Sequence, residues 1–146
     1  MSSRLLAIGA IVLMLLIGGA GFAFYQSKMN KPVDRWVAFS LETMEVGQRE
    51  RWVKEWRDIS DDEELLKRVV ADQNLASAWG MADEAEAVAE LRDRKVIDLW
   101  SDGESMRVMI KGIRKDMALL DSASGALFSE IKNQFLVNHP ELRDKL

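Results

Sequence analysis

The first 27 residues and the rest of the chain differ sharply in how apolar and charged positions alternate. From Leu5 to Tyr25 there are 21 residues without a charge, whereas residues 28–146 mix charged and apolar side chains throughout. A helix rises about 1.5 Å per residue, so this segment would be about 31 Å long, close to the roughly 30 Å hydrocarbon core of a bilayer. The pattern predicts a short tail and transmembrane anchor helix over residues 1–27, followed by a soluble α/β domain over residues 28–146.

The two ends of the apolar segment also suit the two interfaces of a membrane. Arg4 precedes the segment, and aromatic rings, which favour the headgroup zone, close it. The residues expected to anchor the chain are Leu5, Leu16, Phe22, Phe24 and Tyr25. Gly19 and Ala23, four residues apart, are candidates for close packing between two such helices.

A cleavable signal peptide is the alternative interpretation of the same segment. Residues 5–17 resemble the apolar core of a signal peptide, and Gly21-Phe22-Ala23 is a tolerable cleavage site. Apolar residues continue past that site through Tyr25, which favours the anchor. The basic residues that follow weakly favour a cytoplasmic domain, although whole domains can be translocated regardless of flanking charge.

Within residues 28–146 the period of the apolar positions changes between two and about 3.6 residues. A period of two predicts strands over residues 35–42, 96–100 and 106–110, with a turn at 101–105 and Gly112 ending the last strand. A helical period predicts helices over residues 47–59, 60–79, 82–94 and 115–139. Ser60 is expected to cap the second helix and Gly80 to end it. The expected fold class is α+β: an N-terminal transmembrane helix, then a three-stranded sheet packed against about four helices in the order β-α-α-α-β-β-α.

Short runs inside these elements resemble those of a known family. The runs are Leu65-Leu66, Val69-Val70, Asn74-Leu75-Ala76, Trp79-Gly80, Ala87-Val88 and Leu91-Arg92, then Val96, 105–110 and 116–126. In this order they resemble the N-terminal portion of the bacterial polysaccharide chain-length determinants of the Wzz type. The resemblance implies a periplasmic domain that oligomerises on the bacterial inner membrane and helps to set the length, assembly or export of a surface polysaccharide, without chemistry of its own. The family's long helix and second membrane span have no counterpart in this sequence.

Charge and residue types narrow the classes of partner and chemistry. Residues 28–146 hold 19 basic and 24 acidic side chains, a net charge of about −5, without a polybasic stripe, so nucleic acid is not an expected partner. There is no cysteine and a single histidine, His139. The four acids of residues 61–64 lie in one helical turn, which suits a helix N-terminus better than a cation site. We therefore expect no enzymatic activity, no metal and no cofactor.

Five tryptophans are many for 146 residues, and their rings could fill the core or contact a partner. Trp52 and Trp56 share the apolar face of their helix. Trp36 alternates with Val37 and Phe39 and is the best candidate for an exposed ring. Trp36, Trp52 and Trp56 are therefore candidate partner contacts, with core packing as the default interpretation.

Two hypotheses of function follow. The first is a non-enzymatic, membrane-anchored protein of surface polysaccharide assembly, chain-length control or export, which acts through oligomerisation. Its expected partners are membrane lipid, further copies of itself and other polysaccharide assembly or export proteins, with the domain in the periplasm and a single pass through the bacterial inner membrane. The second is a single-pass anchored adaptor that binds a protein partner unrelated to glycans.

Overall fold

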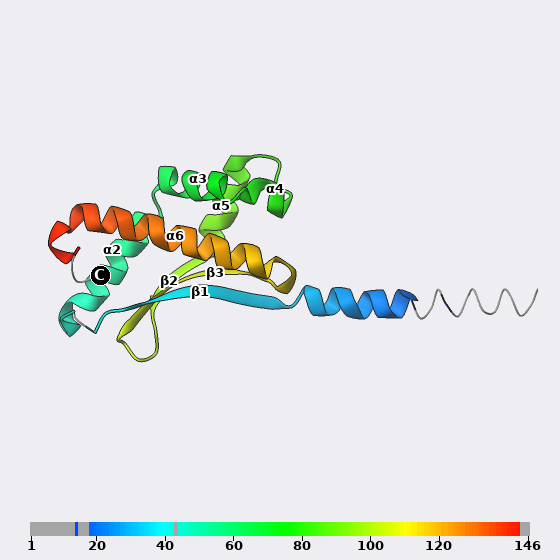
Figure 1. Ribbon diagram of the computed structural model, residues 1–146, viewed down its shortest axis with the longest axis horizontal. Coiled ribbons are helices and arrows are strands. Elements are labelled where there is room, and N and C mark those ends of the chain that lie inside the picture. The colour runs from blue at the N-terminus through cyan, green and yellow to red at the C-terminus, as the bar shows by residue number, and fades with distance from the viewer. Residues whose placement is uncertain (1–13, 15–17, 43, 144–146) are drawn as a thin grey trace, which may run out of the picture.

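The computed structural model describes residues 14, 18–42 and 44–143, which form a helix followed by an α+β domain (Figure 1). The elements are β1 (Pro32–Ser40), α2 (Val46–Ser60), α3 (Glu63–Asp72), α4 (Leu75–Trp79), α5 (Glu84–Arg94), β2 (Lys95–Leu99), β3 (Ser105–Ile113), the 3-10 turn η1 (Arg114–Asp116), α6 (Met117–Asn138) and the 3-10 turn η2 (Pro140–Leu142). The helix over residues 18–29 projects from the domain and leads directly into β1.

The prediction of a transmembrane anchor helix is corrected by the structure. None of the helices in the described part of the chain is both long and apolar enough to cross a membrane. In the described part of this region, Met14 and residues 18–29 are helical. Phe22, Phe24 and Tyr25 lie on this helix and are exposed. Leu5 and Leu16 lie outside the described residues.

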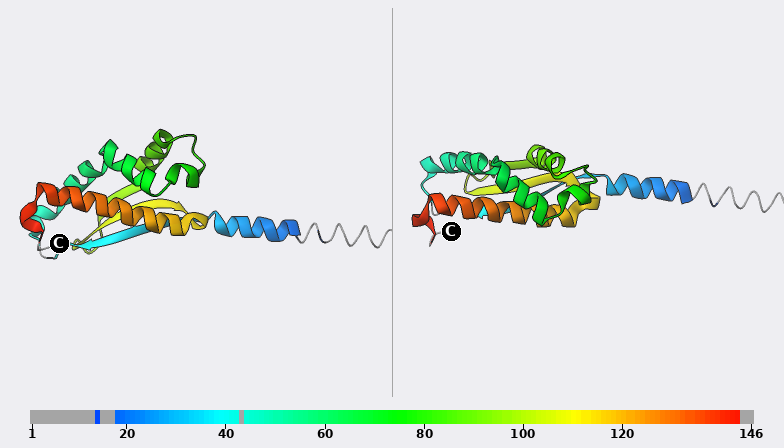
Figure 2. Two further views of the ribbon diagram at one scale, coloured as in Figure 1. Left: turned by 45° about the horizontal axis from the view of Figure 1, so that its top comes forward. Right: turned by 90° about the horizontal axis from the view of Figure 1, so that it is seen from above.

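The three strands form one antiparallel sheet in the order β1-β3-β2. Trp36 and Val96 both lie opposite Met109, and one residue further along Val37 and Ile97 both lie opposite Val108. Figure 2 shows the helices of the domain gathered on one side of this sheet. Alternate residues of β1 are therefore half-buried under the helices, and those between them are exposed.

The core lies between the helices and the covered face of the sheet. Trp56 of α2 is 1% exposed, and its ring contacts Phe39, Phe128 and Phe135, with centroids 5.6 to 5.8 Å apart. Burying one large apolar side chain contributes about 1.5–3 kcal/mol. This aromatic cluster joins α2, β1 and α6, segments far apart in the sequence.

The predicted second helix begins later than expected and is interrupted. Ser60 is not its cap: it is the fully buried last residue of α2, and Asp62 caps α3 by accepting a hydrogen bond of 2.8 Å from the N–H of Leu65. The predicted continuous helix over 60–79 is wrong, because Asn74 has φ 50° and separates α3 from α4. Gly80, with φ 69°, ends α4 as predicted. Five helices, α2 to α6, therefore stand in the described domain where about four were expected.

Gly112 does not end the last strand, because β3 continues to Ile113. It lies opposite Val33 and under α6, where a Cβ would approach Leu120 Cδ1 to 2.5 Å. The glycine is needed because α6 lies close on the sheet at this point.

Candidate functional site

Among the described residues, helices cover only one face of the sheet, and we call the other the open sheet face. Its residues are Asp34, Trp36, Ala38, Val96, Asp98, Trp100, Arg107, Met109 and Lys111, assigned from the strand register and the alternation of side chains. Met109 is 5% exposed even without a covering layer, because it lies between Trp36 and Val96 on the neighbouring strands. The face therefore has an apolar centre with charged groups around it.

The rings of this face are held in place by their neighbours. Trp36, 45% exposed, meets Trp100 edge to face with ring centroids 4.6 Å apart. Arg107 lies over the ring of Trp100 at 5.1 Å and donates two hydrogen bonds to Asp98, of 2.5 and 2.9 Å. Hydrogen bonding from Arg107 lowers the pKa of the Asp98 carboxyl, so the pair remains ionised at neutral pH. Ordered aromatic rings that keep exposed area are typical of contact surfaces.

Strand β1 also leaves one row of backbone groups without a partner. The Leu41 N–H donates to the Glu104 carbonyl at 2.6 Å, and the Arg114 N–H donates to the Lys31 carbonyl at 2.9 Å. In an antiparallel pair such bonds alternate, so the odd-numbered residues of β1 bond to β3 and the even-numbered ones direct their N–H and C=O groups away from it. No backbone partner for these outward groups occurs within residues 18–42 or 44–143. We call the outward groups of residues 34, 36, 38 and 40 the free edge.

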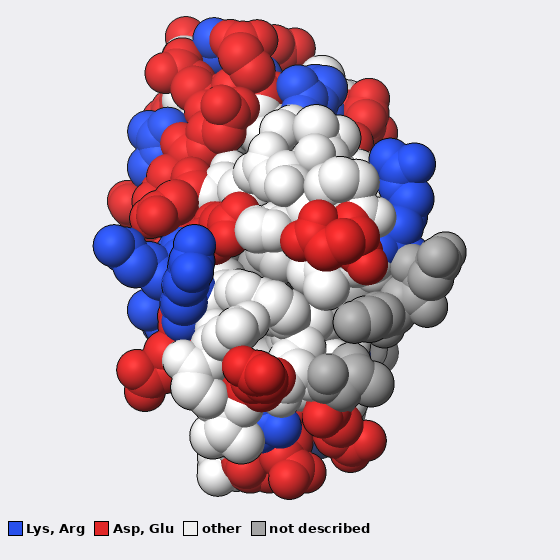
Figure 3. Space-filling view, turned by 90° about the vertical axis from the view of Figure 1, so that its left-hand side faces the viewer, with Lys and Arg blue, Asp and Glu red and all other residues white. Residues whose placement is uncertain are grey.

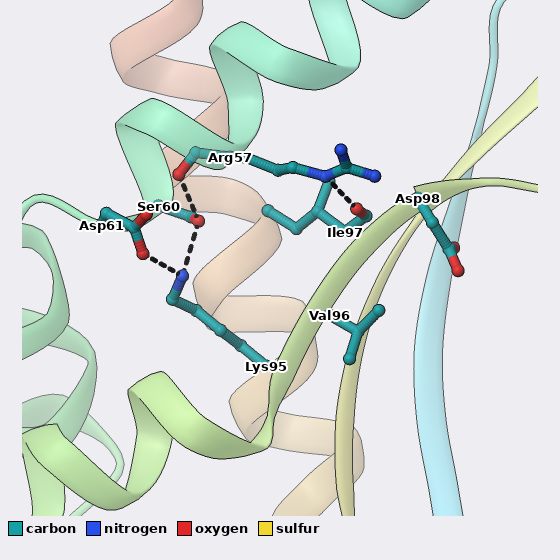
Figure 4. A pocket seen from close by; sticks show the side chains of 7 residues that line it. All are labelled: Arg57, Ser60, Asp61, Lys95, Val96, Ile97 and Asp98. Carbon is teal, nitrogen blue, oxygen red and sulfur yellow. Dashed lines mark hydrogen bonds and ion pairs between the residues drawn. The ribbon is translucent and has the colours of Figure 1, made fainter.

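The opposite edge of the sheet, along β2, is closed by helix α2. The Trp100 N–H donates to the Ser105 carbonyl at 2.7 Å, so the same alternation directs the carbonyl of Ile97 outward. Arg57 Nε donates to that carbonyl at 2.6 Å, as Figure 4 shows. A second strand cannot bond to Ile97 while Arg57 occupies it, which leaves β1 as the edge open to pairing.

Figure 4 also shows a side-chain cluster beside this edge, in a depression of about 460 Å³. Lys95 Nζ donates to Asp61 at 2.5 Å and to Ser60 Oγ at 2.9 Å. A lysine beside a serine hydroxyl is a pairing found in acyl-transfer enzymes. Here the Ser60 side chain is fully buried and donates to the Arg57 carbonyl at 2.7 Å, and the lysine is neutralised by Asp61. The cluster fixes the end of α2 to the start of β2.

His139 makes a second long-range contact between helices. Its Nε2 lies 2.8 Å from the Glu55 carboxylate of α2, and its ring packs against Phe135 with centroids 4.6 Å apart. It thereby joins the end of α6 to α2. Among the described residues, no group of three or more His, Cys, Asp or Glu side chains is arranged to hold a metal ion.

The charged groups on the surface are mixed in sign. Figure 3 shows the end of the molecule where α6 finishes, with acidic side chains among and around an uncharged area and basic groups mainly at its sides. On the open sheet face, Asp98 and Arg107 likewise pair with each other. Such a surface suits contact with another protein surface of mixed charge.

The residues predicted as partner contacts are distributed differently from expectation. Trp36 is exposed, as the alternation of β1 indicated, whereas Trp56 lies in the core and cannot meet a partner in this structure. Trp52 is half-buried, with its ring centroid 5.9 Å from that of Phe135. Sequence reasoning missed Trp100 and the free edge, because both depend on the long-range pairing of β1 with β3.

Gly19 and Ala23 are exposed on the helix over residues 18–29. A Cβ at Gly19 would meet no atom within 4 Å. The space that close packing of two such helices would need is present, and the pairing itself stays a prediction.

The fold and this surface define a class: a small α+β domain with a one-sided antiparallel sheet and one closed edge. No protein-family model, curated protein or solved structure matches the chain. The likeness to polysaccharide chain-length determinants therefore stays a prediction from the sequence.

Proposed function

We propose that this protein is non-enzymatic and acts by contact, as a self-associating component of a larger assembly. The observation that carries the proposal is the free edge of β1 beside the exposed ring of Trp36. A row of unpaired backbone groups is a template for pairing with another chain unless a protein covers, shortens or charges it. Here the edge strand is nine residues long, and only Asp34 and Arg35 on it are charged.

The process served is proposed from the sequence resemblance. The runs shared with chain-length determinants make assembly, chain-length control or export of a surface polysaccharide the candidate process, with the domain in the periplasm. The Ser60 and Lys95 side chains both make structural contacts, to the Arg57 carbonyl and to Asp61. A role through self-association requires no reaction from them.

A second candidate is an adaptor that binds a different protein through the same surface. The fixed pair of Trp36 and Trp100 favours it, because exposed aromatic side chains next to an arginine are frequent anchors in protein interfaces. The two candidates differ in whether the purified protein associates with itself.

Self-association can be measured on the full chain by sedimentation velocity over a range of concentrations, with a nonionic detergent present to keep the uncharged residues 5–25 from aggregating. We expect a concentration-dependent increase in mass, weakened at least about tenfold by Trp36→Gln, since loss of a contact residue of this kind costs about 1.4 kcal/mol or more. Val137→Gln is the matched control, because Val137 is 66% exposed and lies near the end of α6, away from the sheet. A chain that is monomeric at every concentration would contradict the proposal.

The polysaccharide part needs a separate test in cells. Deleting the gene should change the length distribution or the amount of exported surface polysaccharide, and the wild-type gene should restore it. An unchanged polysaccharide, together with self-association in solution, would reject this process and retain the contact role.

A further inference from the structure

We propose that two copies of this chain pair through β1, in antiparallel orientation, about a two-fold axis at Trp36. The pairing would join two three-stranded sheets into one continuous sheet, with both Trp36 rings on its open face. The inference rests on the proposed function and specifies the contact by which the copies associate.

The closed edge of β2 restricts the symmetry of this contact. Pairing between β1 of one copy and β2 of the next is head to tail and would continue from copy to copy, as an open filament or a ring. Arg57 blocks that arrangement by occupying the outward carbonyl of Ile97. Pairing of β1 with β1 uses the same edge of both copies and gives a closed dimer.

The charges of β1 select among the possible registers. The outward groups belong to even-numbered residues, so the numbers of two paired residues must have an even sum. An axis at Asp34 would place two carboxylates opposite each other, and an axis at Arg35 would do the same with two guanidinium groups; both are unfavourable. An axis at Trp36 places Asp34 opposite Ala38 of the partner subunit and Arg35 opposite the partner's Val37. It also brings together the two exposed rings, a favourable cross-strand pair, which an axis at Val37 would separate.

The position of α6 fits the same pairing. Helix α6 packs on both β1 and β3, and an axis midway between these two strands would lie roughly 2.4 Å inside β1, half a strand spacing. With paired strands about 4.8 Å apart, the two α6 axes would lie about 10 Å apart, the usual distance between packed helices. At this spacing the two α6 helices would pack side by side.

Gly125 lies where those two helices would approach each other. Asp121, four residues earlier on the same side of α6, pairs with Arg35, and Phe128, three residues later, contacts Phe39. Gly125 therefore lies on the β1 side of α6, level with the proposed axis. Apart from the neighbouring backbone of α6, a Cβ at Gly125 would meet no atom of the described residues within 4 Å. A large side chain at this position can therefore disturb the dimer without disturbing the monomer.

Cysteine cross-linking tests the register directly, because the chain contains no cysteine. Full-length Asp34→Cys and Ala38→Cys chains are mixed, equilibrated and oxidised. In the proposed register residues 34 and 38 of the two copies face each other with Cα atoms about 5.5 Å apart, within disulfide reach. We expect the mixture to give a cross-linked heterodimer, and each variant alone to give at least about tenfold less cross-linked product, because identical positions lie about 14 Å apart.

Two further variants test the contact without cysteine. Ala38→Pro removes an outward N–H that the monomer does not use, and Gly125→Arg adds bulk between the helices; each should weaken association at least tenfold. Gly125→Ala is the matched control, and circular dichroism with urea unfolding confirms that every variant is folded. Association that persists in these variants and forms no link between residues 34 and 38 would overturn the β1 pairing and leave the proposed function standing. A wild-type chain that never associates would overturn both.

Discussion

Two glycine-to-alanine substitutions give a quantitative test of how α6 lies on the sheet. Both add one methyl group. At Gly125, in the interior of α6, the added Cβ meets nothing within 4 Å, so Gly125→Ala should stabilise the domain by about 0.5–1 kcal/mol through helix propensity alone. At Gly112 the Cβ would lie 2.5 Å from Leu120 Cδ1, about 1 Å inside normal carbon contact.

The cost at Gly112 follows from the burial of its neighbour. Leu120 is fully buried, so its side chain cannot turn into solvent to make room, and overpacking of this kind costs about 1–3 kcal/mol. Replacing a strand glycine by alanine also stabilises the folded state by about 0.5–1 kcal/mol, because the unfolded chain loses conformational freedom. Gly112→Ala should therefore destabilise the domain by about 0.5–2 kcal/mol, and the two variants should differ by about 2 kcal/mol.

Urea unfolding monitored by tryptophan fluorescence measures this difference. With a slope of about 2 kcal/mol/M, the unfolding midpoints of the two variants should lie about 1 M apart on opposite sides of the wild-type midpoint, with unchanged slopes. If Gly112→Ala were as stable as Gly125→Ala, the close approach of α6 to β3 would be wrong, and with it the position of α6 used to place the dimer.

Two further substitutions test contacts at the open face and at the closed edge. Asp98→Asn should lower stability by about 1 kcal/mol at pH 7. Because Arg107 lowers the pKa of Asp98 in the folded state, this contribution is complete above the unfolded pKa of about 3.9 and is lost as the pH falls through the folded pKa. The thermal stabilities of wild type and variant should therefore converge below about pH 4, and a constant difference down to pH 2 would contradict the assignment. Arg57→Met keeps the apolar stem of the side chain but leaves the Ile97 carbonyl unpaired, which should lower the free energy of unfolding by about 1.5 kcal/mol. Light scattering should also rise on heating, because the uncovered β2 edge can then pair with other chains. Unchanged unfolding and scattering would show that the contact does not close that edge.

Local sequence patterns were sufficient where an element is specified by its own residues. The alternation of Val37 and Phe39 placed β1 within three residues of its observed start, and the turn before Ser105 placed the β2–β3 hairpin. Trp36 was expected to be exposed for the same reason, because side chains in a strand alternate between faces.

The errors arose where a distant residue decides the local structure. Ser60 has a side chain that can cap a helix, but its hydroxyl donates to the Arg57 carbonyl of α2 and accepts from Lys95 of β2. Asp62 caps α3 in its place. Asn74 interrupts a stretch whose apolar pattern alone is continuous, because asparagine tolerates positive φ. Trp52 and Trp56 lie on the same face of their helix, so the sequence does not distinguish them. Trp56 is inaccessible because Phe39, Phe128 and Phe135, which are distant in the sequence, pack around it.

The site itself was predicted only in part. The sequence indicated an exposed Trp36, but the free edge depends on which strand lies in the middle of the sheet, and the order β1-β3-β2 results from long-range pairing. The anchor was predicted from the hydropathy of residues 5–25, but no helix of the described residues is both long and apolar enough to cross a membrane.

Amide hydrogen exchange along β1 tests the central claim most directly, since it reports on the backbone groups that the claim requires a partner to cover. At high protein concentration the amides of Trp36 and Ala38 should exchange slowly, and on dilution they should become fast while Val37, bonded to β3, remains protected. Fast exchange of Trp36 and Ala38 at every concentration, with Val37 protected throughout, would show that the edge stays open and would contradict the account.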